Sequence, residues 1–349
     1  MQADADTRHQ PRLNQELRDG RARSQSRSLS IVVCAYNEEN NIEHMLRAVA
    51  NQRGPSFHVL EIIVVASGCT DRTVEIVHSV ASTDSRVIPI VQLRREGKVA
   101  ALRVGLGRAT AEIVLVEGAD TLPASGAYEE VAQGFADETV QLVCCHPVPS
   151  EQVRSFTRAM SVTLWDLHHE VSLIAPKPGE AYAIRRETSR LLTGFEDDDW
   201  LIGALVRNNT VKGVYAPNAI VYNRVPGTIR ELVMQRSRIN GQGYRLRSSK
   251  GLSTATGDPR IMIRAFQNQL KAHPQSVLPL AGLACVEIAA RVWARAASLR
   301  EGSSAPIWTR LETTKGRIEP KVATNENHHG RGSPETFRPK DPTIDQRVK

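Results

Sequence analysis

The stretch LSIVVCAYNEENNIEHML, residues 29–46, decides the fold. Its first seven residues are almost all apolar, and the polar turn after them leads into apolar residues at helical spacing. Further apolar runs follow, separated by helical patterns: VLEIIVVA (59–66), RVIPIVQL (86–93) and AEIVLVE (111–117). This alternation predicts an α/β fold, with a mainly parallel sheet flanked by helices on both faces.

The turns that follow these strands are the expected place for ligands, because parallel α/β sheets bind ligands beyond the carboxyl ends of their strands. Residues 35–37, 66–71 and 118–120 are therefore expected on one rim of the sheet. Within the last turn, Asp120 comes just past an apolar run. A single carboxylate at that position indicates a role in ligand binding.

The second half of the chain departs from this alternation. A long amphipathic segment, 151–174, follows the run VQLVCCHPV. Strand-like runs then return: GEAYAIRR (179–186), VKGVYAP (211–217) and AIVYNRV (219–225). We expect this half to complete the sheet and to form an acceptor side.

The chain ends are polar and rich in Pro and Gly, a composition typical of disorder. We therefore expect the following organisation: a disordered tail over 1–28, one domain over 29–250 with a nucleotide half (29–123) and an acceptor half (124–250), a helical region over 251–300, and a disordered tail over 301–349. Within the helical region, residues 276–300 are apolar for about fifteen positions, which falls short of the roughly 20 residues of a membrane-spanning helix. An interfacial membrane helix and a packing helix both remain open.

Composition and charge exclude several classes of protein. The five cysteines form no CxxC pair and no metal-ligand spacing, and residues 1–28 contain no apolar signal-peptide core, so we expect a cytoplasmic protein. Residues 227–272 hold nine Lys/Arg against two acids, where an anion should bind. That stretch has few aromatics and no recognisable module, which disfavours nucleic-acid binding. No GxGxxG follows the first strand, which disfavours a dehydrogenase.

Four motifs in order, SIVVCAYNEENNI, EIIVVASGCTDRTVEIV, EGKVAAL and EGADTLP, resemble the inverting glycosyltransferases of family 2, which have the GT-A fold. EDDDW, YAPNAIVYNRVP and QRSRI extend the resemblance, which covers residues 29–247. It implies a Rossmann-like nucleotide-diphospho-sugar transferase that moves a sugar to an acceptor hydroxyl by direct displacement.

The resemblance also implies a set of donor-binding residues. These are Ala35, Tyr36, Asn37, Glu38, Ser67, Lys98, Ala119 and Asp120. Two motifs depart from the family pattern: Ala-Ser-Gly (66–68) replaces Asp-Asp-Gly, and Gly-Ala-Asp (118–120) replaces Asp-x-Asp. Asp71 matches a later acid of the family, but we expect it mainly to cap the following helix.

Asp120 is the expected metal ligand, because Mg²⁺ or Mn²⁺ needs only one or two carboxylates in addition to substrate phosphates. Glu117 is a second acid that could replace the missing one, or could face away from the site. A turn acid with no metal is the structural alternative for Asp120.

The general base is expected in EDDDW, at Asp198, with Asp197 and Asp199 as alternates. Clustered acids raise one another's pKa, which suits a base that works near neutral pH. The resemblance places Glu180, Arg185, Gln235, Arg236 and Arg238 on the acceptor or phosphate side. Of the adjacent His168 and His169, at most one should face the site, because neighbours on a helix point about 100° apart.

The resulting hypothesis is a glycosyltransferase that uses a nucleotide-sugar donor and a divalent cation. Its acceptor hydroxyl belongs to a lipid-linked molecule, a polysaccharide or a small molecule, and the enzyme works in the cytoplasm or at the inner face of the cell membrane as a peripheral protein. The alternative is a catalytically degenerate GT-A protein that binds a nucleotide-sugar or acts as a scaffold.

Overall fold

The computed structural model describes residues 26–150, 154–192, 198–301 and 314–318. These residues form one mixed, eight-stranded sheet with the strand order β3-β2-β1-β4-β7-β6-β8-β5. The strands are β1 (Arg27–Ala35), β2 (Phe57–Ser67), β3 (Val87–Gln92), β4 (Ile113–Gly118), β5 (Thr121–Pro123), β6 (Leu142–Pro149), β7 (Tyr182–Arg185) and β8 (Gly213–Asn223).

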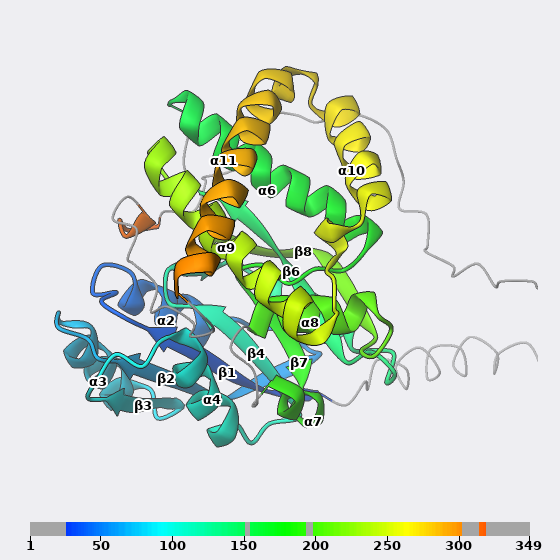
Figure 1. The fold of residues 1–349 in the computed structure, drawn as a ribbon. Helices are drawn as coiled ribbons and strands as arrows, with labels where there is room; N and C mark the ends of the chain where they lie inside the picture. The colour runs from blue at the N-terminus through cyan, green and yellow to red at the C-terminus, as the bar shows by residue number, and fades with distance from the viewer. Residues whose placement is uncertain (1–25, 151–153, 193–197, 302–313, 319–349) are drawn as a thin grey trace, which may run out of the picture.

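Helices flank the sheet and form a separate layer at the top of the view in Figure 1. The α-helices are α2 (Ile42–Ala50), α3 (Thr73–Thr83), α4 (Lys98–Arg108), α5 (Ala127–Gly134), α6 (Phe156–Ile174), α7 (Arg186–Ser189), α8 (Asp198–Arg207), α9 (Ile229–Lys250), α10 (Pro259–Ala272) and α11 (Val277–Glu301). Short 3₁₀ turns are η1 (Arg190–Leu192), η2 (Ala255–Gly257) and η3 (Pro274–Ser276).

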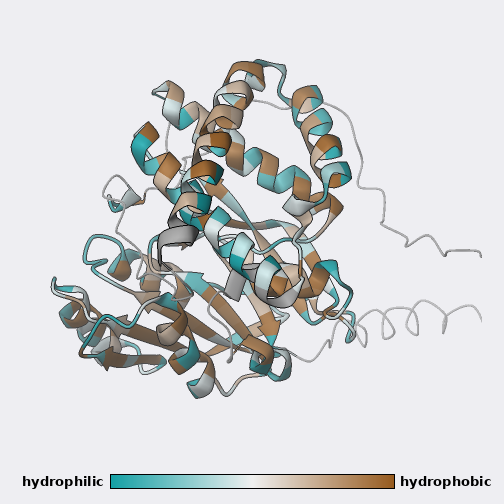
Figure 2. Ribbon diagram, viewed as in Figure 1, coloured by the Kyte–Doolittle hydropathy of each residue, from teal (hydrophilic) through white to brown (hydrophobic). Residues whose placement is uncertain are grey.

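The first half of the chain forms the expected parallel unit. Strand β1 pairs in parallel with both β2 and β4, and β2 pairs in parallel with β3. These strands are mainly hydrophobic along their length (Figure 2), as expected for strands covered on both faces. The predicted mainly parallel α/β class is confirmed.

Successive side chains of β1 enter different cores, because neighbouring residues of a strand point to opposite faces. Ile31 and Val33 pack in the core that includes residues of α2 and α5, whereas Val32 packs in the core that includes residues of α4. Helix α4 approaches β1 closely at Gly105, where an added Cβ would lie 2.4 Å from the nearest Val32 methyl carbon. Both layers are therefore fixed to the strand that carries the donor turn.

The second half completes the sheet. Strand β7 pairs antiparallel with β4 and with β6, and β8 pairs parallel with β6 and antiparallel with β5. The runs 211–217 and 219–225, expected as separate strand-like segments, form the single strand β8. A register shift between Cys144 and His146 of β6 lets both parts of β8 pair with it.

The upper layer in Figure 1 contains α6, α9, α10 and α11, and α11 packs against α9 and α6. In the described part of the chain, Pro274–Ala296 is the one segment long and apolar enough to cross a membrane, with a mean hydropathy of 1.6 and 28% of its window buried. By length and composition, our expectation that this stretch falls short was wrong. Leu278 and Trp293 expose 72% and 66% of their surface.

Candidate active site

Three strand ends meet at one rim of the sheet, as expected. Ala35 of β1 pairs with Ala66 of β2, and Cys34 pairs with Gly118 of β4. Because these strands run parallel, the turns that follow them begin at the same edge. The rim therefore brings together the turns from which the expected donor residues come.

The turn after β1 is joined to the turn after β2. Asn37 has a positive φ of 54°, a conformation that asparagine tolerates better than most residues. Its side-chain amide donates to Thr70 Oγ1 at 3.0 Å, and its Oδ1 accepts from the Thr70 backbone N–H at 2.8 Å. The guanidinium of Arg95 lies 3.8 Å from the centre of the Tyr36 ring. Tyr36 thus forms part of a fixed surface at the rim.

Ser67 faces the loop before α4 and is buried. Its Oγ accepts from the Glu96 backbone N–H at 3.3 Å and donates to the Arg94 carbonyl at 3.5 Å. The next residue, Gly68, has a φ of 63°, and an added Cβ would lie 2.3 Å from the backbone nitrogen of Arg95. In the position where the family has an acid, this chain therefore uses a short hydroxyl to hold a neighbouring loop.

Asp71 has the local role expected for it. One carboxylate oxygen accepts from the backbone N–H and from the hydroxyl of Thr73, the first residue of α3, at 3.0 and 2.5 Å. The other oxygen accepts from the backbone N–H of Glu39 at 3.2 Å. Asp71 therefore ties the start of α3 to the turn after β1.

Asp120 and Glu38 share one cation at this rim. The Nζ of Lys315 lies 2.7 Å from Oδ2 of Asp120, and it also pairs with Oε1 of Glu38. Only 4% of the Glu38 side chain is exposed, against 34% for Asp120. The sequence analysis named both acids but missed Lys315, which lies among residues assigned to a tail and belongs to no family motif.

The pKa values of the two acids differ because their surroundings differ. Burial, and then repulsion from Asp120, raise the pKa of Glu38 to about 7, although Lys315 opposes the shift. Burial also acts against ionisation of Asp120, but the Lys315 ammonium outweighs it and holds the pKa of Asp120 below its usual value. Asp120 is therefore ionised at neutral pH, whereas Glu38 can exchange a proton there.

A second group of charges adjoins Asp120. Lys98 is the first residue of α4, and its charge favours ionisation of both Asp120 and Glu180. Glu180 accepts from the Asn223 side-chain amide at 3.2 Å, and burial followed by the charge of Asp120 raises its pKa. Burial lowers the pKa of Arg238, whose charge interacts with both acids. Asp120, Glu180, Lys98 and Arg238 thus form one group of interacting charges.

Glu117 faces the core. Its two carboxylate oxygens accept from the hydroxyls of Thr121 and Tyr128, at 2.6 and 3.2 Å, and only 2% of its surface is exposed. Burial raises the pKa of Glu117 to about 7. Of the two alternatives left open by the sequence, the structure therefore favours the one in which Glu117 does not replace the missing acid of the rim.

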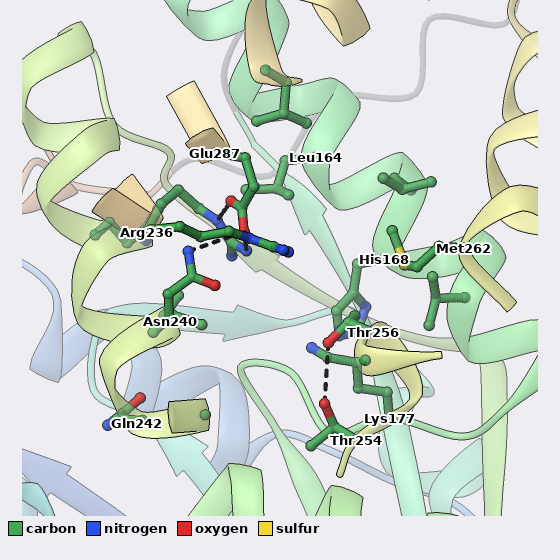
Figure 3. A pocket seen from close by; sticks show the side chains of 18 of the residues that line it. Leu164, His168, Lys177, Arg236, Asn240, Gln242, Thr254, Thr256, Met262 and Glu287 are labelled. Carbon is green, nitrogen blue, oxygen red and sulfur yellow. Dashed lines mark hydrogen bonds and ion pairs between the residues drawn. The ribbon is translucent and has the colours of Figure 1, made fainter. Parts of the chain in front are cut away.

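A pocket of about 740 Å³ lies between the donor rim and the helical layer, and Figure 3 shows it from close by. Lys98, Glu180 and Arg238, whose charges interact with that of Asp120, line part of this pocket. Apolar side chains from several helices form much of the wall; they include Leu164, Trp165, Val171, Met262, Phe266 and Leu283. The pocket therefore combines charged side chains with apolar walls.

Two of the expected phosphate-side residues line this pocket beside Arg238. They are Gln235 and Arg236, both on α9. The guanidinium of Arg236 is 2.9 Å from the carboxylate of Glu287 on α11, and the Asn240 amide donates to the same carboxylate at 3.0 Å (Figure 3). Arg236 thus joins α9 to α11.

The adjacent histidines of α6 point to different places, as expected. His168 lines the pocket (Figure 3). Its Nε2 lies 3.2 Å from the Pro178 carbonyl. His169 pairs with the hydroxyl of Tyr215 at 2.7 Å and stacks on His146. His168 is therefore the one that adjoins the candidate acceptor space.

Arg185 does not reach the rim. It pairs with Ile113 at the start of β4, whereas Asp120 follows the end of that strand. Its guanidinium binds Glu112 and Glu138, each at 2.8 Å, and is largely buried. The expected acceptor contact at Arg185 is not supported by this placement, since the residue lies at the end of β4 opposite the rim.

The expected base falls at the margin of the described residues. Helix α8 begins at Asp198, so that residue stands at a helix start, as the resemblance implies. Asp197 and the side chains of Asp198 and Asp199 lie outside the described part of the structure. The assignment of Asp198 stays a prediction.

The residues at the rim fit a divalent cation of the magnesium type. Within the described ranges, no group of three or more His, Cys, Asp and Glu side chains could hold a metal ion. The carboxylates of Asp120 and Glu38 nevertheless lie close enough together to pair with the same ammonium group, that of Lys315. Such a cation commonly takes one or two carboxylates together with substrate phosphates, so this pair fits an ion that binds with a nucleotide diphosphate.

Comparison with known proteins agrees with this geometry. Residues 30–200 match the family described as Glycosyl transferase family 2. A prophage bactoprenol glucosyl transferase homolog of Escherichia coli is 31% identical over 87 residues, or 25% of this chain and 28% of the relative. An undecaprenyl-phosphate 4-deoxy-4-formamido-L-arabinose transferase of Pseudomonas fluorescens is 30% identical over 93 residues, or 26% and 27%. Each match thus spans about a quarter of the relative's length.

The fold also resembles that of a solved structure. A mannosyltransferase from Pyrobaculum calidifontis, in complex with GDP-Man and Mn²⁺, covers 84% of each chain with a TM-score of 0.52 and 23% identity. Together with the sheet, this likeness defines the fold as that of the GT-A glycosyltransferases. Residues 30–200, just under half of the chain, therefore resemble the domain of glycosyltransferase family 2.

Proposed function

We propose that this protein transfers one sugar, with inversion, from a nucleotide-diphosphate sugar to a hydroxyl of a lipid-linked acceptor. One arrangement carries the proposal: Asp120 at the donor rim interacts electrostatically with Lys98, Glu180 and Arg238, and these three residues line the pocket under the helical layer. Donor and acceptor would meet where these charged side chains line the pocket.

In the proposed reaction, the acceptor oxygen attacks the anomeric carbon from the face opposite the diphosphate. The new carbon–oxygen bond forms as the bond to the diphosphate breaks, so the configuration inverts. The hydroxyl proton passes to a carboxylate base, for which Asp198 is the candidate, and the nucleoside diphosphate leaves with the bonding electrons.

The charge that develops on the leaving diphosphate is the main electrostatic demand of this reaction. Asp120, assisted by Glu38, would hold a divalent cation, Mg²⁺ or Mn²⁺. When bound, this ion would neutralise phosphate charge. The charges of Lys98 and Arg238 interact with that of Asp120, and these two side chains would bind phosphate or sugar oxygens. The Mn²⁺ and GDP-Man of the Pyrobaculum mannosyltransferase support this choice of ligands.

A lipid-linked acceptor is the choice that the pocket favours. Its walls include Leu164, Met262 and Leu283, which suit an alkyl or isoprenoid chain, while its basic residues suit a phosphate near the reacting end. Two relatives carry bactoprenol or undecaprenyl-phosphate in their names, which supports the same class. Polysaccharide and small-molecule acceptors are the competing choices.

The proposed place of action is the cytoplasmic face of the cell membrane. Helix α11 borders the pocket at Leu283 and Ile288, and it exposes Val292 and Trp293 to solvent. Apolar side chains of this kind favour insertion into a lipid surface. A lipid acceptor would then enter the pocket from the membrane beside α11.

A second candidate function is nucleotide-sugar binding or scaffolding without catalysis. It is favoured by the rim itself, where Ser67 is bonded to the 94–96 loop and Gly118 provides no carboxylate. This candidate predicts donor binding with no turnover.

The experiment is a transfer assay on the full chain. Radiolabelled UDP-, GDP-, CDP- and dTDP-sugars are each supplied with Mn²⁺ or Mg²⁺ and with polyprenyl-linked acceptors in detergent, and binding of each nucleotide is measured in parallel. Transfer to a lipid-linked acceptor supports the proposal. Binding without transfer to any acceptor supports the scaffold, and neither binding nor transfer contradicts both.

A further inference from the structure

The segment Thr314–Ile318 lies against the donor rim, although it is far from the rim residues in sequence. It appears in dark orange in Figure 1. Lys315 bonds to Asp120 and Glu38, which are 195 and 277 residues away along the chain. The segment therefore returns from beyond α11 to the site at which the donor is expected.

Several contacts away from the lysine hold this segment in place. Ile318 is 2% exposed, and its backbone N–H donates to Oδ1 of Asn41 at 3.2 Å. Arg224 donates from Nη1 to the Arg317 carbonyl at 3.0 Å. At Gly316 an added Cβ would lie 2.4 Å from the same guanidinium nitrogen. The segment is therefore docked by its backbone and by a buried apolar side chain, as well as by Lys315.

The ammonium of Lys315 takes the position of a cation between two carboxylates. Its pKa is raised, because the charges of Asp120 and Glu38 outweigh the effect of burial, so it is protonated at neutral pH. The carboxylates that it pairs with are also the ones that would hold the divalent cation. A lysine cation and a metal ion at the same oxygens would repel each other.

We infer that the 314–318 segment is a built-in competitor of the divalent cation, and that it must undock before the metal ion and the donor diphosphate can bind. This inference rests on the proposed function, since it assumes that Asp120 and Glu38 belong to a donor site. The apparent affinity for metal is then the intrinsic affinity multiplied by the fraction of molecules in which the segment is undocked.

Two substitutions test this competition through different contacts. Lys315→Met removes the competing charge and keeps a side chain of similar length. Ile318→Ser keeps the lysine but removes the buried anchor. Lys212→Met is the control, because Lys212 pairs with Asp137, outside the donor site. Circular dichroism and thermal unfolding establish that each variant is folded.

Mn²⁺ binding to the full chain is measured by electron paramagnetic resonance of the free ion, without nucleotide and then with saturating UDP or GDP. We expect both Lys315→Met and Ile318→Ser to bind Mn²⁺ about tenfold more tightly than the wild type, and Lys212→Met to be unchanged. A second readout is hydrogen exchange at the Ile318 amide, which should accelerate when Mn²⁺ and nucleotide bind to the wild type.

The outcomes separate this inference from the proposed function. If nucleotide binds to the wild type but Mn²⁺ affinity is unchanged or weaker in both segment variants, the competition is refuted and the proposed function stands. Weaker nucleotide binding in Lys315→Met would make Lys315 a donor ligand, which also overturns the inference. If no protein, including Lys315→Met, binds Mn²⁺ or nucleotide, both proposals fail.

Discussion

Arg236 of α9 and Glu287 of α11 form an ion pair across the wall of the pocket, with 2.9 Å between Nε and Oε2. Each side chain is about one-fifth exposed, at 18% and 21%. Asn240 and Arg291 donate to the same carboxylate. Glu287 is therefore a common acceptor that fixes the position of α11 relative to α9.

Glu287→Gln should lower the free energy of unfolding by about 1 to 2 kcal/mol, because it leaves Arg236 partly buried without a counter-charge. Urea denaturation measures the change. The matched control is Glu43→Gln, which breaks an exposed pair with Arg47 and should cost less than about 0.5 kcal/mol. Equal effects of the two substitutions would show that the Arg236 pair does not stabilise the helical layer.

Asp120→Asn should reduce sugar transfer by about 10² to 10³-fold, because it removes the ionised carboxylate expected to hold a cation at the leaving diphosphate. Steady-state rates with the active donor measure this effect. Asp137→Asn, at an exposed acid that pairs with Lys212, should keep the wild-type rate. A folded Asp120→Asn variant with the wild-type rate would remove Asp120 from the mechanism.

Asp198→Asn should slow transfer to a hydroxyl by about 10² to 10⁴-fold, because the acceptor proton loses its base. Asp199→Asn is the comparison, since Asp199 is the next residue and an alternate base. Loss of activity only in the Asp199 variant would move the assignment by one residue. An acceptor phosphate is already ionised, so full activity in the Asn variants of Asp197, Asp198 and Asp199 alike would indicate that phosphate is the nucleophile.

The pH dependence of stability should contain a contribution from Glu117. Burial raises the pKa of its folded state from 4.5 to about 7, so the native protein binds more protons than the unfolded chain between these values. This contribution to stability is present below about pH 4.5 and is lost as the pH rises through about 7. The loss is on the order of 3 kcal/mol. Glu117→Gln should remove it, as urea denaturation from pH 5 to 8 would reveal; an unchanged pH profile would contradict the assignment.

Ala284→Trp should raise the KM for a lipid-linked acceptor about tenfold, equivalent to about 1.4 kcal/mol, because Ala284 lines the pocket and a large ring would fill part of it. The nucleotide affinity should stay unchanged. Ala289→Trp, an exposed position on the same helix that does not line the pocket, is the control. A similar KM change in both variants would argue against acceptor binding in this pocket.

Much of the fold follows from local patterns. The apolar runs predicted as strands form β1, β2, β3 and β4, of which β1, β2 and β4 are largely buried and β3 is only partly buried. The four-residue spacing of Ile42 and Leu46 marks the buried face of α2. The family resemblance drawn from motif order is confirmed in its coarse form by the match over residues 30–200. The role of Asp71 could also be predicted from local sequence, because its contacts lie within its own turn and the turn after β1.

Other features depend on tertiary contacts that a linear pattern does not contain. The family resemblance placed Arg185 on the acceptor side, but the antiparallel register of β7 places it beside the start of β4, at the end of that strand opposite the rim. The two strand-like runs form the single strand β8, whose residues between Tyr215 and Ile220 have no paired partner in β6. Lys315 lies beyond α11 in the sequence. Its contact with Asp120 is a tertiary contact, which no periodic pattern of residues predicts.

The place of Asn223 at the end of β8 has a further consequence. This residue pairs with Thr121, immediately after Asp120, and its amide donates to Glu180 at the pocket. A ligand that displaces Glu180 would therefore break a contact of the residue that pairs with the strand next to Asp120. By thermodynamic reciprocity, any such coupling changes both affinities by the same factor. Occupancy of the pocket and occupancy of the rim would then be linked through one amide side chain, and the two substrates would not bind independently.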